Sequence, residues 1–298
     1  MEDIVKNYYN LEGNFTKISN DLYLIYSNDT YYYFMKCLRN EEELNDIGKI
    51  CLELKNIGVR LDEIILNGEN KVVTNNFVLV KINFFLDSDT SLKEMLKYNE
   101  KLVVSKPVVN NWASLWEQKI DYLEYQIGEL GIDKIELITS FSYYIGLAEC
   151  ALLVLKNVER KYNKDTKLVL SRIRINYPNY DKDYFNPLNF ILDNRMRDIA
   201  EYIKSMFFKK EDVWTSIYEI FKKPYSIYEY NIFYARMLFP TYYFDLFEDI
   251  ILENRDGKEI FTITNLLDDY QNFLSDLYFY LSKFAPLENI SCITKRSN

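Results

Sequence analysis

The feature that most constrains the fold of this chain is a stretch of about forty residues from Leu168 to Phe208. An apolar run opens the stretch, a turn-rich segment follows, and a short strand-like run, Phe190–Leu192, then ends on Asp193. Helical periodicity starts at Arg197. The pattern predicts a strand, a loop, a second strand that ends in a carboxylate, and then an amphipathic helix.

Composition narrows the class of protein. The chain has 298 residues, 48% of them hydrophobic, which is enough for one large domain or for two joined lobes. A net charge of −9 argues against the binding of nucleic acid, because its phosphates require a basic protein surface. The first residues lack a signal-peptide pattern, and the longest apolar run, 141–155, is too short to span a membrane. The four cysteines show no metal-ligand spacing, so we expect reduced thiols in a cytoplasmic protein.

The chain contains no histidine. This absence excludes Ser–His and Cys–His nucleophile pairs and imidazole general bases. It also removes the residue type that most zinc sites use.

The N-terminal part reads as short strands around one helix. Apolar residues recur at helical spacing between Glu41 and Ile57, and Asn67-Gly68 is typical of a hairpin turn. The predicted strands are Phe15–Ile18, Leu22–Tyr26, Tyr31–Lys36, Glu63–Leu66, Lys71–Thr74 and Phe77–Phe85.

Helical periodicity dominates the remainder of the chain. A polar segment at Asp87–Ser91 marks the predicted boundary, so we expect a strand-rich lobe over 1–88 and a helical lobe over 89–298. The fold class is therefore α+β. The predicted helices run from Asn111 or Ser114 to Leu130, then Phe141–Arg160, Val213–Phe221, Ser226–Phe239, Tyr242–Asn254 and Thr264–Phe284.

The stretch from Leu168, together with Phe141–Glu149, resembles the CotS-type spore-coat-associated proteins, bacterial relatives of the aminoglycoside and choline kinases. The resemblance covers most of residues 110–210 and reaches the N-terminal part only through the order of its elements and Lys36. It implies a bilobal, protein-kinase-like fold with a small β-rich N-lobe and a large helical C-lobe.

The resemblance also implies roles for three residues. Lys36 would reach the phosphates of Mg-ATP with Glu53 as its partner, and Asp193 would hold Mg²⁺. A solvated lysine and a surface glutamate are the structural alternatives for the first two. For Asp193 the alternative is a helix N-cap or a buried partner of Arg195 or Arg197.

Other positions depart from the kinase pattern. The resemblance places Arg172 at the catalytic histidine and Arg174 at the catalytic aspartate, and an arginine cannot accept a proton at working pH. The turn between the first two strands has no glycine to approach a phosphate, and Asp21 in it would repel one. We expect Asp198, near a helix start with Glu201 as a capping partner, to pair with one of these arginines.

Two functions follow from these observations. In the first, the chain is a catalytically impaired kinase-like protein, a pseudokinase, with a structural or interaction role associated with the spore coat and with protein partners. In the second, it is an active phosphotransferase that uses Mg-ATP on a small hydroxyl- or amine-bearing substrate, with an unidentified base; Asp181 and Asp183 are weak candidates. The missing histidine, aspartate and glycine loop favour the first.

Overall fold

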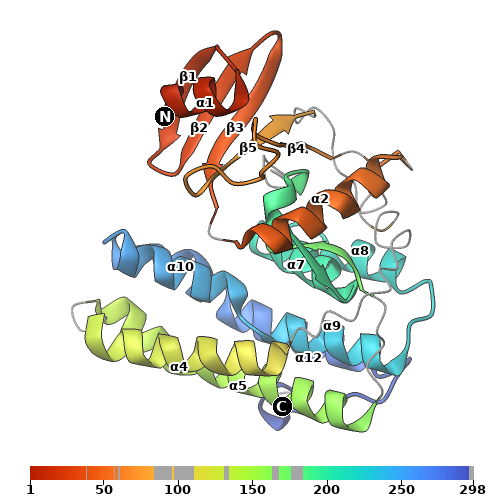
Figure 1. The fold of residues 1–298 in the computed structure, drawn as a ribbon. Helices are drawn as coiled ribbons and strands as arrows, with labels where there is room; N and C mark the ends of the chain where they lie inside the picture. Colours follow the sequence, from red (N-terminus) through yellow and green to blue (C-terminus); the bar gives the residue numbers. More distant parts are fainter. Residues whose placement is uncertain are drawn as a thin grey trace. The chain divides into compact units, whose positions relative to one another are not determined.

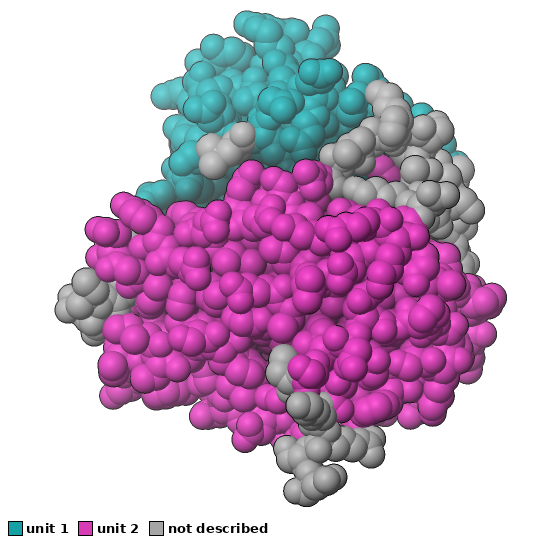
Figure 2. Space-filling model, turned by 90° about the horizontal axis from the view of Figure 1, so that it is seen from below, with its two compact units in different colours: residues 1–102, 170–192 teal, residues 103–169, 193–298 magenta. Residues whose placement is uncertain are grey.

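A computed structural model describes residues 1–294 except 38, 57, 60, 84–95, 97–110, 131–133, 163–167 and 176–183. The chain forms two compact units, coloured separately in Figure 2. The first unit consists of Met1–Leu102 and Leu170–Leu192, and the second of Val103–Val169 and Asp193–Asn298.

The first unit is built on a five-stranded sheet of order β1-β2-β3-β5-β4 (Figure 1). Every neighbouring pair is antiparallel. A tight turn joins β2 to β3, and Asn28 and Asp29 adopt the left-handed conformation in it. The strands are β1 (Asn14–Ser19), β2 (Leu22–Ser27), β3 (Thr30–Lys36), β4 (Glu63–Ile65) and β5 (Phe77–Ile82).

The turn into β5 differs from the prediction. Lys71–Thr74 is not a strand; only Thr74 forms an isolated bridge, to Phe77. The predicted turn at Asn67-Gly68 is present, because the Asn70 N–H donates to the Asn67 carbonyl at 2.9 Å. A second tight turn, at Asn75 and Asn76 with positive φ, leads into β5. Asparagine tolerates this conformation because its short side chain can hydrogen-bond locally.

Helices cover both faces of the sheet. Helix α1 (Glu2–Tyr9), which the sequence pattern did not predict, lies on one face of the sheet (Figure 1). Its Val5 packs with Ile25, Phe34, Phe77 and Leu79. On the other face Leu44 of helix α2 (Glu41–Asn56) packs with Val78 and Val80. Such two-sided burial explains why β5 is apolar at consecutive positions.

The two strands of the Leu168–Phe208 stretch pair with each other. Strand β6 (Val169–Arg172) and strand β7 (Phe190–Asp193) form a two-stranded sheet, and helix α7 (Met196–Phe208) follows. The predicted order of strand, loop, strand and helix is therefore confirmed.

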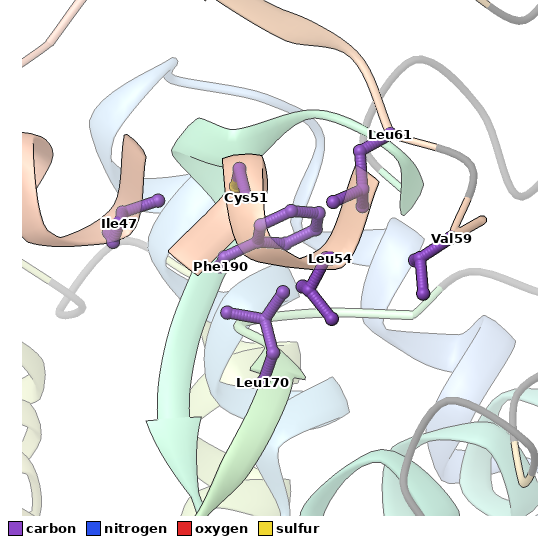
Figure 3. Close-up of a cluster of buried hydrophobic side chains, with 7 residues drawn as sticks. All are labelled: Ile47, Cys51, Leu54, Val59, Leu61, Leu170 and Phe190. Carbon is purple, nitrogen blue, oxygen red and sulfur yellow. The ribbon is translucent and has the colours of Figure 1, made fainter. Parts of the chain in front are cut away.

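An apolar cluster joins this small sheet to helix α2. Leu54 and Cys51 of α2 pack with Leu170 and Phe190, as Figure 3 shows. Burial raises the pKa of the Cys51 thiol to about 12, so this cysteine stays protonated. The cluster explains why residues 170–192 group with the first unit, a division that differs from the predicted boundary at residue 88; Asp87–Ser91 lies outside the described residues.

The second unit is helical. Helix α5 (Ile135–Lys161) begins six residues before the predicted start and packs against α4 (Trp112–Leu130) and α9 (Ile227–Leu238). It is long and apolar enough to cross a membrane by length and composition alone, but ten of its side chains are buried within the unit. The remaining helices are α8 (Val213–Ile220), α10 (Thr241–Leu252), α11 (Phe261–Thr264), α12 (Leu267–Leu281) and α13 (Ser291–Thr294), with short 3-10 turns at Pro187–Asn189 and Gly257–Ile260.

These elements confirm the predicted fold class. The N-terminal region is a β-sheet with helices on it, the remainder is mostly helical, and the fold is of the kinase-like α+β type.

Candidate functional site

A groove of about 820 Å³ lies within the first unit, at the end of strand β3. Its walls come from the end of β3, the start of helix α2, the residues after β6 and the turn before β7. The lining residues are Met35, Lys36, Cys37, Arg39, Asn40, Glu43, Arg174, Asn186, Leu188 and Asn189.

Lys36 is the last residue of β3, and its side chain is exposed. Its Nζ lies 3.2 Å from Oδ1 of Asp21, in the turn between β1 and β2, and its backbone N–H donates to the Asp21 carbonyl. Asp21, in the turn that has no glycine, thus pairs with the lysine, a contact that the sequence did not predict. The predicted partner, Glu53, is exposed on α2, and no ion pair joins it to Lys36 in the described part of the chain.

Gly13, the glycine nearest to that turn, has a packing role. A Cβ atom at this position would lie 2.3 Å from the carbonyl oxygen of Tyr26. The close approach of the chain to β2 therefore requires glycine here.

Arg39 is the most firmly positioned cation of the groove. Its Nη1 donates to the carbonyl of Phe190 at 2.6 Å and lies 3.3 Å from the carboxylate of Glu43. The side chain is only 16% exposed. Asn40 caps helix α2 beside it, because its Oδ1 accepts from the Glu43 N–H.

The two arginines at the end of β6 and just after it differ in environment. Arg172 is buried; its guanidinium stacks 4.1 Å from the ring of Tyr184, and its Nε donates to the Tyr184 carbonyl. Arg174 is half-buried and lines the groove, where its Nη1 donates to the carbonyl of Ile173. Arg172 is thus a packing residue, and Arg174 is a cation placed where a ligand could meet it.

Two asparagines complete the wall. Asn186 is 1% exposed; its Oδ1 accepts from the Leu188 N–H, and its Nδ2 lies 3.2 Å from the sulfur of Met35. Asn189 donates from Nδ2 to the carbonyl of Arg174. Asn186 thus fixes the turn before β7, and Asn189 fixes the backbone at Arg174.

Asp193 lies in the second unit and is 2% exposed. Its Oδ1 accepts from the indole Nε1 of Trp112 at 3.0 Å and from the Asn194 N–H at 2.7 Å. Its Oδ2 accepts from Arg197 at 3.1 Å and from Arg236 at 2.5 Å. Both oxygens of this carboxylate therefore already hold two donors each.

The two arginines also share the ring of Trp112. Their guanidinium carbons lie 4.7 Å and 4.9 Å from its centroid, for Arg197 and Arg236 respectively. Burial lowers the pKa of Arg236, and Asp193 opposes that effect. A magnesium ion does not fit here, because it would meet two buried cations and a carboxylate whose lone pairs are occupied. The environment of Asp193 therefore does not support the predicted metal role and matches its alternative, a buried partner of Arg197.

The start of helix α7 also differs from the prediction. Asp198 is fully buried at the third position of the helix, and Glu201 pairs with Lys204 at 2.7 Å instead of capping. Asn194 satisfies the first turn, because its Oδ1 accepts from the Met196 N–H. The pairing of Asp198 with Arg172 or Arg174 stays a prediction. Asp181 and Asp183 lie outside the described residues.

Sequence reasoning missed several residues that the structure brings together. Arg39 and Asn186 of the groove are separated by 147 positions, and Trp112 and Arg236 reach Asp193 from two other helices. No spacing in the sequence signals these contacts. Among the described residues, no cluster of His, Cys, Asp or Glu side chains could hold a metal ion.

Comparisons with known proteins agree with this geometry. Residues 2–277 match the family described as "Spore coat putative kinase YutH". The endospore coat-associated protein YutH of Bacillus subtilis (strain 168) is 26% identical over 200 residues, which are 56% of this chain and 56% of that protein. The match thus spans little more than half the length of this relative. The predicted resemblance to spore-coat-associated kinase-like proteins is confirmed.

Solved structures show the same fold. The aminoglycoside phosphotransferase from Alicyclobacillus acidocaldarius subsp. acidocaldarius DSM 446 superposes with a TM-score of 0.67 at 10% identity, over 95% of this chain and 96% of that one. Spectinomycin phosphotransferase, in complex with ADP and spectinomycin, gives a TM-score of 0.54 at 14% identity, over 96% of this chain and 94% of that one. At these identities the likeness concerns the fold alone.

Proposed function

The chain belongs to the spore coat YutH family, and we propose that it acts there as a catalytically impaired kinase-like protein with a structural or interaction role. The family suggests a location in the spore coat. A cytoplasmic location stays a prediction from the sequence, and protein components of the coat are the proposed partners.

The environment of Asp193 carries this proposal. Phosphoryl transfer needs carboxylates that hold Mg²⁺ against the phosphates of ATP. Asp193 instead neutralises Arg197 and Arg236, which are 6% exposed in their side chains. Arg174 adds support, because a guanidinium cannot take the proton of a substrate hydroxyl.

An active phosphotransferase is the alternative, and Lys36 at the rim of the groove favours it. In that case Mg-ATP would be the cofactor, with Lys36 and Glu53 as its predicted contacts. In the structure Lys36 forms an ion pair with Asp21, and Glu53 is exposed. Neither residue is therefore arranged to contact Mg-ATP. We therefore prefer the impaired protein.

A phosphoryl-transfer assay tests the choice. The full chain is incubated with Mg-ATP and a panel of aminoglycosides and amino alcohols, and release of ADP is measured against a Lys36→Ala variant. We expect no release above that of the variant. Turnover that Lys36→Ala abolishes would overturn the proposal and establish the enzyme.

The coat role is tested in spores. We expect an epitope-tagged chain to fractionate with the extracted coat of purified spores and to cross-link to other coat proteins. An Arg174→Gln variant should fractionate in the same way, because the role does not require chemistry. Recovery of the tagged chain in the spore core alone would contradict a coat role.

A further inference from the structure

A second hollow of the first unit lies between helix α2 and strand β4, and we call it the α2–β4 pocket. It shares no lining residue with the groove at the end of β3. Its volume is about 490 Å³, within the usual range for pockets that bind small molecules. Cys51 and Leu61, which Figure 3 shows in the apolar cluster against α2, also line this pocket.

Gly48 keeps the pocket open on the side of the helix. It lies in the middle of α2 with a helical backbone, and a Cβ atom there would meet no heavy atom within 4 Å. Glycine in a helix is less favourable than alanine, because it loses more backbone freedom on folding. Neither a close contact nor an unusual conformation requires glycine at this position. Its effect in the structure is the space beside it.

The charges around the pocket are paired within the fold. Lys55 of α2 lies 2.9 Å from the carboxylate of Glu63 in β4, and Lys49 lies 3.1 Å from that of Asp46. Asp62 accepts a hydrogen bond from a backbone N–H after β5 at 2.9 Å. The described lining residues therefore balance two lysines against two acids. A charged ligand would lose its hydration here without meeting an unpaired counter-charge.

Two exposed leucines lie at the rim of the pocket. Leu52 of α2 is 61% exposed, and Leu66, just after β4, is 48% exposed. Large apolar side chains that are exposed beside an apolar hollow mark a surface that is stabilised when it is covered. An apolar molecule in the pocket would remove part of both leucines from water.

An extended protein segment is the competing occupant, because β4 is the last strand of the sheet. In the ranges that the structure describes, no strand pairs with its outer edge. However, β4 has three residues, so an added strand would find few backbone hydrogen bonds. A hollow of this volume with apolar walls therefore fits a small molecule better than a strand.

We propose that the α2–β4 pocket binds an uncharged, apolar small molecule. The ligand packs on the backbone of α2 at Gly48, between Leu44 and Leu52, which lie four residues to either side in one row along the helix. Ile64 of β4 faces it from the sheet. The inference goes beyond the proposed function, because a coat component needs no small-molecule ligand.

Fluorescence titration of the full chain tests the pocket with N-phenyl-1-naphthylamine, an uncharged aromatic dye that emits more strongly in apolar surroundings. We expect saturable binding. The anionic dye 8-anilinonaphthalene-1-sulfonate should bind about tenfold more weakly, because its sulfonate would be desolvated without a counter-charge. Equal or tighter binding of the sulfonate would contradict an uncharged ligand.

Gly48→Leu fills the pocket from the helix. It should lower the affinity for the uncharged dye about tenfold, the loss expected when roughly two methylene-sized groups of the dye are no longer buried. Leucine has a higher helix propensity than glycine, so we expect this variant to fold. Circular dichroism checks that it does.

Gly128→Leu is the matched control. Gly128 also lies within a helix, α4, and a Cβ atom there would likewise meet no heavy atom within 4 Å. It does not line the pocket, so the substitution should leave the affinity for the dye unchanged.

Leu52→Glu is a second variant that does not disturb the core, because Leu52 is exposed. A hydrated carboxylate at the rim should lower the affinity for the uncharged dye about threefold. If Gly48→Leu fails to fold, Leu52→Glu still decides, because unchanged affinity contradicts the inference.

Several outcomes would overturn the site. They are absence of saturable binding of the uncharged dye, equal affinity of the wild type and Gly48→Leu, and an equal loss in Gly128→Leu. If Gly48→Leu removes the cross-links to coat proteins but keeps the affinity for the dye, the occupant is a protein segment and the inference is wrong. Absence of dye binding leaves the proposed function standing, whereas phosphoryl transfer from Mg-ATP would remove the proposed function and leave the pocket unaffected.

Discussion

Arginines gather in two regions of this molecule, and they are used in opposite ways. In the second unit Arg197 and Arg236 are buried on one tryptophan, with Asp193 between their charges. In the first unit Arg39 and Arg174 line a groove, and Glu43 is the carboxylate among its described lining residues. The buried arrangement in the second unit stabilises the fold, whereas the arginines of the first unit lie at the wall of a cavity.

The difference shows what decides the role of a charged residue. A buried charge must be neutralised locally, because desolvation costs several kcal/mol per ion. A charge at the wall of a groove keeps part of its hydration and can exchange it for a ligand. The residue type, arginine, is the same in both regions. The nearby counter-charge and the access to solvent therefore determine the role of each arginine.

The largest expected effect is on the buried cluster. Asp193→Asn removes the counter-charge of two buried arginines and should lower the free energy of unfolding by about 3–5 kcal/mol. Urea unfolding followed by tryptophan fluorescence measures it, because Trp112 donates to this carboxylate.

The matched control for that experiment is Asp46→Asn, which removes an exposed carboxylate that pairs with Lys49. It should change stability by less than about 1 kcal/mol. Equal small effects of the two substitutions would show that Asp193 is not the centre of a buried ion cluster.

The second effect concerns the apolar support of the groove. Leu54→Ala opens a cavity against Leu170 and Phe190 and should cost about 3 kcal/mol, within the usual range for a buried leucine. Leu52→Ala, at an exposed position on the same helix, is the control. Hydrogen exchange should show that β6 and β7 lose protection together with α2; unchanged protection of β7 would contradict their grouping in one unit.

A smaller effect depends on pH. Burial opposes the charged form of Glu229, but hydrogen bonds from Arg195 and Ser226 outweigh it and hold its pKa below the ordinary 4.5. Because its pKa is lowered in the folded state, ionised Glu229 stabilises the fold above about pH 4.5. This contribution is lost as the pH falls through the lowered pKa.

Glu229→Gln removes the salt bridge and weakens the capping box that starts α9. It should cost about 1–2 kcal/mol at pH 7. The difference from the wild type should shrink as the pH falls below about 4.5, which chemical denaturation at several pH values measures. A difference that is constant with pH would rule out the ion pair as its cause.

The smallest expected effect on stability is at the groove, in contrast to the buried cluster around Asp193. Asp21→Asn breaks an exposed ion pair with Lys36 and should change the free energy of unfolding by less than about 0.5 kcal/mol. Thermal unfolding checks it. A loss comparable to that of Asp193→Asn would mean that this end of the sheet depends on the pair for its structure.

Much of the fold could be predicted from the sequence because its signals are local. Strands β2 and β3 follow from apolar and aromatic runs around an Asn-Asp turn, and α4 follows from a stripe at helical spacing. The turn at Asn75-Asn76 was not predicted, and the pairing of Thr74 with Phe77 reveals it. Helix α1 was missed because only Val5 of its eight residues is buried.

The sequence by itself determined the absence of histidine, the cationic side chains at 172 and 174, and the order of strands and helices. Only the tertiary structure decided that Arg172 packs on Tyr184 while Arg174 lines a groove. It also decided that the carboxylate oxygens of Asp193 accept hydrogen bonds from Trp112 and Arg236. The physical reason is that burial and counter-charge come from residues far away along the chain. A sequence states which charges exist, and packing determines which of them are already neutralised.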